Sequence, residues 1–185
     1  LIGVAKPNAE LATVLDTLLQ DPSVVVFTEK TSNLSHPNAI GAIDCLMAPL
    51  ELEQNEGEAE LKPDLLLTIG GMIVSKKIIF FLRKHRALNH FHIDQTKAND
   101  TFYYLSQHIH APAENIPTAL TEISTAKSDY QFNILSRYRN YLQKGRGYLS
   151  KIPFSDLRVF ELITQALPQN THLQVANSSP IRYLQ

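Results

Sequence analysis

The sequence predicts an α/β fold built on a doubly wound, mostly parallel sheet, and three observations support this expectation. Short apolar runs of strand length alternate with longer amphipathic stretches, in the order β-α-β-α-β-α-β. The apolar runs show little polar alternation, which is typical of strands covered by helices on both faces. Apolar residues make up 44% of the chain and charged residues 19%, so a substantial core can form.

Each element is expected from its local pattern. Asn8 and Ser155 are good N-caps for the helices that follow them, and Pro22 and Pro168 end helices. Strands are expected at residues 1–4, 24–27, 65–69 and 89–93, within 103–109, and at 173–175. Helices are expected at residues 9–20, 39–50, 73–84, 116–124, 130–149 and 156–167, with a polar loop at 31–38, an acidic linker or frayed helix at 51–62, and another helix opening at 177–180.

The character of the chain changes near Lys151-Ile152-Pro153. Residues 1–150 show a self-contained α/β pattern, whereas residues 151–185 contain one helix, one strand and a helix start. We therefore expect one complete domain over 1–150 and the truncated start of a second over 151–185. Because the chain begins at Leu1 without a methionine and stops inside an expected helix, we also expect it to be a piece of a longer protein.

The charge balance and composition exclude several classes of function. With 17 basic and 18 acidic residues the formal net charge is −1, which argues against a nucleic-acid partner. The single cysteine excludes a disulfide scaffold, and the sequence shows neither a signal peptide nor an apolar run of membrane-spanning length. A cytoplasmic protein with no membrane span is therefore expected.

Function is expected at the carboxyl ends of the strands, where ligands of such sheets bind. Gly70-Gly71 follows the strand at 65–69, and Lys76 and Lys77 lie in or near the first turn of the next helix. A helix N-terminus disfavours cations and attracts anions, so a bound anion would offset the cost of placing two lysines there. The glycines do not form the dinucleotide fingerprint G-x-G-x-x-G. Two solvated surface lysines are the alternative interpretation.

A second strand end carries histidines. Alternation places His90, His92 and Asp94 on one face of their strand. Metal ligands need a spacing of this kind, but no cysteine or acidic cluster in the sequence supports a metal site here. We therefore expect these residues to shape the strand end, with Asp94 capping the next turn. His108 and His110 repeat the spacing and are an equally weak signal.

The third strand end is the corner formed by Asn177 and Ser178. A strand–turn–helix corner with hydroxyl groups suits a polar substrate. Arg182, one turn further on, could form a bidentate pair with a carboxylate. A simple helix cap and a surface arginine are the alternative.

Two other features are expected to be structural. Cys45 lies in an apolar stretch without an accompanying histidine motif, so a buried structural cysteine is expected. Residues 130–146 interleave aromatic and basic side chains, which would suit RNA. A solvated helix face with a Tyr/Leu core stripe is the favoured account.

Five strings occur in a specific order along the chain, and together they resemble one enzyme family. They are TSNLSHPN at 31–38, PDLLLTIGG at 63–71, VSKK at 74–77, HID at 92–94 and NSSPIRY at 177–183. The chain resembles, over essentially its whole length, the central part of the 2-succinyl-5-enolpyruvyl-6-hydroxy-3-cyclohexene-1-carboxylate synthases. These are thiamine-diphosphate enzymes of menaquinone biosynthesis.

The resemblance implies a transferase with three α/β domains. Residues 1–150 would be its central Rossmann-like domain, and 151–185 the start of the C-terminal diphosphate-binding domain. The family adds a succinic semialdehyde equivalent, made from 2-oxoglutarate with loss of CO₂, to isochorismate. Thiamine diphosphate is the electron sink, held with Mg²⁺ or Mn²⁺. Because the cofactor lies between domains of different subunits, a homodimer or homotetramer is implied.

The resemblance also implies roles for five residues. Ser178 and Arg182 match the family's Asn-Ser-x-x-x-Arg motif, which contacts substrate carboxylates, and Asn177 belongs to the same corner. Lys76 and Lys77 match a basic pair that faces the active site. The family's catalytic glutamate and its Asp and Asn metal ligands have no counterpart in this chain. We therefore expect no catalytic, cofactor-binding or metal residue here, and neither tight cofactor binding nor activity from the chain alone.

Two other functions remain open at this point. One is a stand-alone Rossmann-like module that binds a nucleotide or an acidic metabolite at residues 70–77. The other is a purely structural domain between two catalytic ones, which is compatible with the synthase.

Overall fold

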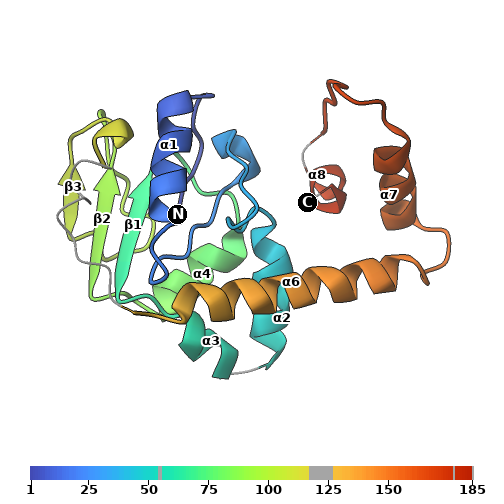
Figure 1. The fold of residues 1–185 in the computed structure, drawn as a ribbon, viewed down its shortest axis with the longest axis horizontal. Helices are drawn as coiled ribbons and strands as arrows, with labels where there is room; N and C mark the ends of the chain where they lie inside the picture. Colours follow the sequence, from blue (N-terminus) through green and yellow to red (C-terminus); the bar gives the residue numbers. More distant parts are fainter. Residues whose placement is uncertain (54–55, 117–126, 177, 185) are drawn as a thin grey trace. The chain divides into compact units, whose positions relative to one another are not determined.

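The computed structural model describes residues 1–53, 56–116, 127–176 and 178–184. These residues form two compact units, Leu1–Tyr138 and Arg139–Gln185, and each unit is described by itself (Figure 1). The domain boundary expected between residues 150 and 151 stays a prediction.

A parallel sheet lies at the centre of the first unit. Its strands run in the order β1 (Leu65–Ile69), β2 (Asn89–Ile93) and β3 (Gln107–Ile109), and both pairings are parallel. The α/β class with a parallel sheet is therefore confirmed. Because parallel strands place their carboxyl ends at one edge, the residues that follow β1 and β2 meet there.

Two segments expected as strands join this sheet only through single bridges. The bridges are parallel and connect Ile2 to Thr28 and Ile69, and Phe27 to Ile40. The expected strand at 24–27 is wrong over residues 24–26, which have no strand pairing. There the backbone of Val24 bonds elsewhere, since its N–H donates to the carbonyl of Asp21 and its carbonyl accepts from the Gln131 side chain.

Helices follow the expected pattern with shifted ends. They are α1 (Ala9–Leu18), η1 (Lys30–Ser32), α2 (Ile43–Glu53), α3 (Glu56–Leu61), α4 (Lys76–Lys84), η2 (Ala113–Asn115), α6 (Tyr130–Leu149), α7 (Asp156–Ala166) and α8 (Ser179–Tyr183). Asn8 caps α1, because its side-chain oxygen accepts from the N–H groups of Glu10 (2.8 Å) and Leu11 (3.3 Å). Ser155 occupies the N-cap position of α7, as expected, but its side chain makes no capping hydrogen bond. The helix expected at 116–124 lies, beyond Ile116, outside the described residues.

The acidic segment 51–62 is largely helical rather than a linker. α2 continues to Glu53, and α3 takes up residues 56–61. Arg137 of α6 fixes both helices, because its guanidinium pairs with Glu53 (3.0 Å) and Glu60 (2.6 Å).

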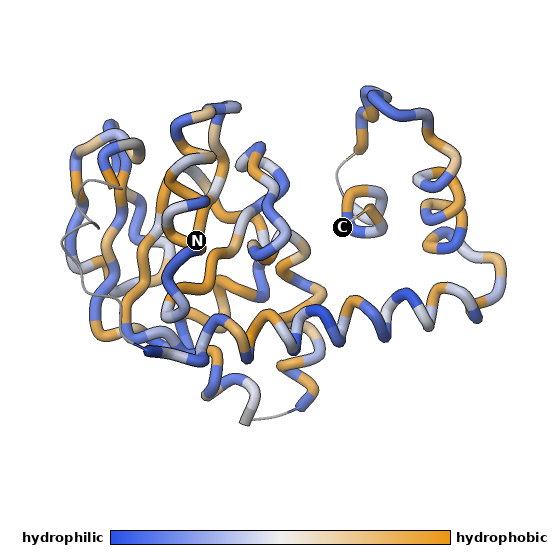
Figure 2. The backbone as a smooth tube through the Cα atoms, viewed as in Figure 1, coloured by the Kyte–Doolittle hydropathy of each residue, from blue (hydrophilic) through white to orange (hydrophobic). Residues whose placement is uncertain are grey.

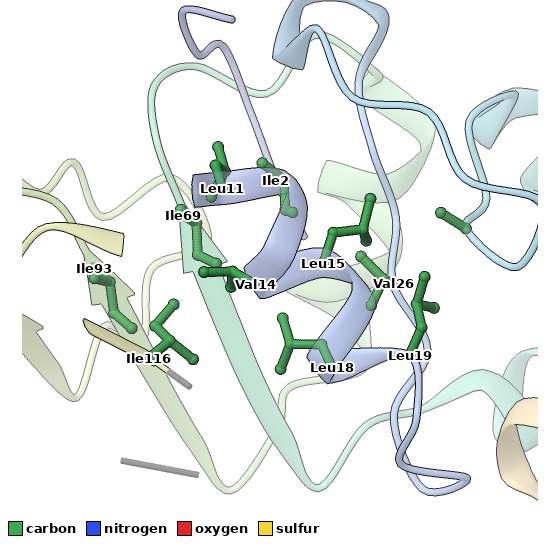
Figure 3. Packing of buried hydrophobic residues seen from close by; sticks show 11 residues of the cluster. Ile2, Leu11, Val14, Leu15, Leu18, Leu19, Val26, Ile69, Ile93 and Ile116 are labelled. Carbon is green, nitrogen blue, oxygen red and sulfur yellow. The ribbon is translucent and has the colours of Figure 1, made fainter. Parts of the chain in front are cut away.

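The core of the first unit lies between α1 and the sheet (Figure 3). Leu11, Val14 and Leu18 of α1 pack in one cluster with Ile69 of β1 and Ile93 of β2. Leu66 and Thr68 alternate to the other face of β1 and are also buried. Both faces of the sheet are therefore covered, as the apolar strands predicted.

α6 carries the expected core stripe, and hydrophobic and hydrophilic segments alternate along its length (Figure 2). Ile134, Tyr138 and Tyr141, at helical spacing, are buried. Burial raises the pKa of Tyr130 to about 12, and its hydroxyl donates to the carbonyl of Leu61 (2.8 Å). These aromatic residues therefore stabilise the fold.

The second unit is sparsely packed. The rings of Phe160 in α7 and Tyr183 in α8 lie 5.4 Å apart, and α7 buries no residue. The strand expected at 173–175 is wrong, because these residues have no strand pairing and an isolated strand leaves its backbone groups unpaired. None of the helices that the structure describes is long and apolar enough to cross a membrane.

Candidate functional site

The glycines after β1 pack against the first residues of the chain. The N–H of Gly71 donates to the carbonyl of Val4 (2.8 Å), and the N–H of Gly3 donates to Ile69 (2.9 Å). A Cβ atom on Gly3 would lie 2.2 Å from the carbonyl oxygen of Gly71, and Gly70 has a φ of +77°. The glycines are therefore required by the close approach of the backbone at residues 3–4.

The start of α4 is bound by an internal carboxylate. Oε1 of Glu29 accepts hydrogen bonds from the N–H groups of Val74 (2.9 Å) and Ser75 (2.8 Å). Glu29 follows the bridged residue Thr28, at the carboxyl edge of the sheet, and is 4% exposed. These two N–H groups are thus taken by the protein's own anion.

Ser75 links this loop to α2. Its hydroxyl donates to Asp44 and accepts from the N–H of Ile78 (3.3 Å), so it caps α4. For this reason α4 begins at Lys76, three residues later than the sequence predicted. The backbone just before the two lysines is therefore fixed from two sides, by Glu29 and by Asp44.

Lys76 and Lys77 lie in the first turn of α4, as the sequence predicted, and are its first two residues, but their environments differ. Lys77 pairs with Glu51 of α2. Lys76 is exposed and makes no ion pair within the part of the chain that the structure describes. Both line a groove of about 460 Å³. Its other lining residues are Met47, Glu51, Glu58, Phe80, Phe81 and Lys84.

The histidines of β2 form a hydrogen-bonded group with β1. The Thr68 hydroxyl lies 2.8 Å from Nε2 of His90 and 2.9 Å from Nδ1 of His92, so both rings are on one face as predicted. Burial lowers the pKa of His90 to about 4 and also lowers the pKa of His92. Within the described residues, the buried Nδ1 of His90 has no hydrogen-bond partner. Protonating the ring would therefore leave a buried N–H group without an acceptor.

Asp94 caps the next turn, as expected. Its Oδ1 accepts from the N–H groups of Thr96 (2.7 Å) and Lys97 (3.2 Å). His108 lies against the same turn, with Nε2 2.9 Å from the carbonyl oxygen of Asp94, and its ring centroid lies 3.7 Å from that of His110 at a tilt of 43°. These residues shape the strand end.

Three kinds of group in the described residues bear on whether a metal, a reactive thiol or thiamine diphosphate fits here. Over the described ranges, no three His, Cys, Asp or Glu side chains are grouped so that they could hold a metal ion. Cys45 is half-buried rather than buried, and burial, followed by the Asp44 charge, raises the pKa of its thiol, which disfavours the reactive thiolate. The N–H groups suited to a diphosphate are bonded to Glu29. No cofactor contact is therefore assigned to these residues.

Ser178 and Arg182 belong to the second unit. Ser178 is the N-cap residue of α8 and has a φ of 76°, a conformation that L-residues rarely adopt and that occurs mainly where function or packing requires it. Arg182 lies exposed in the last turn of α8. Asn177 lies outside the described residues. Lys76 and Lys77 belong to the first unit.

Sequence reasoning missed the acidic residues around the lysines. Glu29, Asp44 and Glu51 are far from Lys76 in sequence, and only the fold brings them to α4. One signal for Glu29 was available, since it is an acidic residue two positions after the apolar run that ends at Phe27, where such sheets place functional side chains.

Fold and site together define a class: a parallel α/β domain that presents two lysines at the start of the helix following the carboxyl end of β1. No family model matches the chain. It is 44% identical over 184 residues to a 2-succinyl-5-enolpyruvyl-6-hydroxy-3-cyclohexene-1-carboxylate synthase from Flavobacterium johnsoniae, covering 99% of this chain and 33% of that protein. Synthases of the same name from Flavobacterium psychrophilum (41% over 186 residues) and Porphyromonas gingivalis (31% over 199 residues) match 100% and 99% of this chain, and 33% of their own lengths.

The chain thus spans about a third of the length of the relatives it matches. The family expected from the five ordered strings is confirmed: this chain is homologous, along its whole length, to a segment of the 2-succinyl-5-enolpyruvyl-6-hydroxy-3-cyclohexene-1-carboxylate synthases.

Proposed function

We propose that the chain is part of a synthase that joins decarboxylated 2-oxoglutarate to isochorismate in menaquinone biosynthesis. The full-length protein would be a transferase that uses thiamine diphosphate with Mg²⁺ or Mn²⁺ and assembles as a homodimer or homotetramer. The observation that carries the proposal is the 44% identity, over 99% of the chain, to a protein of that name.

This chain would contribute cations that bind substrate carboxylates. Both proposed substrates are dicarboxylates. Lys76 and Lys77 offer two ammonium groups at one helix start, where charge-assisted hydrogen bonds to a carboxylate are strong. Arg182 offers a planar fork that matches a carboxylate bidentately. Ser178 and its sequence neighbour Asn177 would bind the same carboxylate as Arg182.

The cofactor chemistry would come from elsewhere in the full-length protein. Thiamine diphosphate supplies an electron sink for the carbanion formed when 2-oxoglutarate loses CO₂. The chain's own residues would bind and orient carboxylates, and no acid, base or metal ligand is assigned to them.

The alternative of a nucleotide-binding module is less well supported. Such a module needs free N–H groups and an open glycine loop at the end of β1. Here Glu29 takes the N–H groups of Val74 and Ser75, and residues 3–4 fill the loop.

The proposal is tested by assaying the full-length protein with isochorismate, 2-oxoglutarate, thiamine diphosphate and Mg²⁺. The expected result is one CO₂ released per adduct formed, with no adduct when either substrate or thiamine diphosphate is omitted. No adduct under complete conditions would contradict it, and binding of ATP or NAD by calorimetry would favour the module.

A further inference from the structure

Glu29 is a buried carboxylate whose charge is met by backbone groups. Within the described part of the chain it forms no ion pair, although it is only 4% exposed. Burying an unpaired charge is costly unless hydrogen bonds or a helix N-terminus compensate it. Two N–H groups at the start of α4 supply that compensation.

The two N–H groups directly precede the lysines of the proposed carboxylate site. Val74 and Ser75 are consecutive, and Lys76 and Lys77 are the next two residues. The direction in which the two lysine side chains project therefore depends on the backbone conformation at residues 74–75. Glu29 reaches this backbone from 45 residues away, so it couples the sheet edge at Thr28 to the first turn of α4.

We infer that Glu29 is a positioning residue for Lys76 and Lys77, acting as the hydrogen-bond acceptor that fixes the backbone from which they project. The inference rests on the proposed function, because it assumes that these lysines bind a substrate carboxylate. Glu29 itself touches no substrate in this account. Its effect on substrate binding passes through the N–H groups of Val74 and Ser75.

Two substitutions separate hydrogen bonding from mere packing. Glu29→Gln keeps an oxygen that can accept both hydrogen bonds, since both end on Oε1. Glu29→Ala removes the acceptor. In the full-length enzyme we expect Glu29→Gln to keep KM for isochorismate and 2-oxoglutarate within about twofold of wild type. Glu29→Ala should raise KM for at least one of them about tenfold, with a smaller change in kcat.

Asn8→Ala is the matched control. Asn8 also accepts two backbone N–H groups on one side-chain oxygen, but at the start of α1. We expect it to lower the unfolding temperature without changing KM. Glu29→Ala lowering the unfolding temperature with KM unchanged would overturn the inference. A Glu29→Gln variant as impaired as Glu29→Ala would also overturn it.

Amide hydrogen exchange of Val74 and Ser75 in the same full-length variants distinguishes this inference from the proposed function. Both amides should be protected in wild type and Glu29→Gln and exchange faster in Glu29→Ala. If the wild type makes no adduct, the proposed function fails. Unchanged exchange in Glu29→Ala would overturn the role of Glu29 whether or not the enzyme is active.

Discussion

At the residue scale, the absence of a side chain matters most where two backbone segments touch. Gly3 and Gly71 lie so close that a Cβ on Gly3 would fall 2.2 Å from a carbonyl oxygen. Gly145 in α6 has no atom within 4 Å of the corresponding position. The same substitution should therefore have opposite effects at Gly3 and at Gly145.

Gly3→Ala should lower the free energy of unfolding by about 2 kcal/mol or more, because the backbone must shift to relieve the overlap. Gly145→Ala should raise it by about 0.5–1 kcal/mol, because alanine loses less backbone entropy in a helix. Urea unfolding followed by circular dichroism measures both. Equal effects of the two substitutions would refute this explanation of the loop.

Arg182 gives a second prediction at this scale. If its guanidinium forms a bidentate pair with a substrate carboxylate, Arg182→Ala in the full-length enzyme should weaken binding by about 2–4 kcal/mol and raise KM. Arg182→Lys should also be impaired, because an ammonium cannot reproduce the planar fork. Steady-state kinetics measure KM in both variants. Wild-type kinetics in Arg182→Ala would rule out a role of Arg182 in binding a substrate carboxylate.

At the scale of elements, strands β1 and β2 are joined by side chains as well as by their backbone ladder. Thr68 of β1 bonds to both His90 and His92 of β2. Burial lowers the pKa of His90 from 6.5 to about 4. Between these values the unfolded chain binds a proton that the folded chain does not. The contribution of neutral His90 to the free energy of unfolding is therefore fully present above about pH 6.5 and is lost as the pH falls toward 4.

The free energy of unfolding should fall by about 3 kcal/mol between pH 7 and pH 4 through His90. Urea titrations at several pH values measure this slope. His90→Phe should flatten this slope. An unaltered slope in His90→Phe would show that other groups cause the acid sensitivity.

Elements defined by nearby residues could be predicted, and those defined by distant partners could not. The cap at Asn8 and the place of Lys76 in the first turn of a helix follow from local sequence. The expected strand at 173–175 failed because a strand needs a neighbour. Glu29 was missed because its partners, Val74 and Ser75, lie 45 and 46 residues away.

At the scale of the whole molecule, the candidate binding residues belong to two separate units. Lys76 and Lys77 lie in one unit and Arg182 in the other. No cluster of metal ligands occurs among the residues that the structure describes. The chain matches a third of the length of its relatives, so under the proposed function the cofactor would be held by the remaining parts.

The 185-residue chain alone should consequently bind thiamine diphosphate and Mg²⁺ more weakly than micromolar. Isothermal titration calorimetry tests this, with the full-length protein as the positive control. Micromolar binding by the isolated chain would mean that it holds a cofactor site of its own.

The most direct test of the central claim, that the start of α4 binds a substrate carboxylate, is the KM of lysine variants in the full-length enzyme. Lys76→Met and Lys77→Met should each raise KM for isochorismate or 2-oxoglutarate about tenfold, with a smaller change in kcat. Lys62→Met, which removes an exposed lysine before β1, should behave as wild type. Wild-type KM values for both substrates in Lys76→Met and Lys77→Met would contradict the claim.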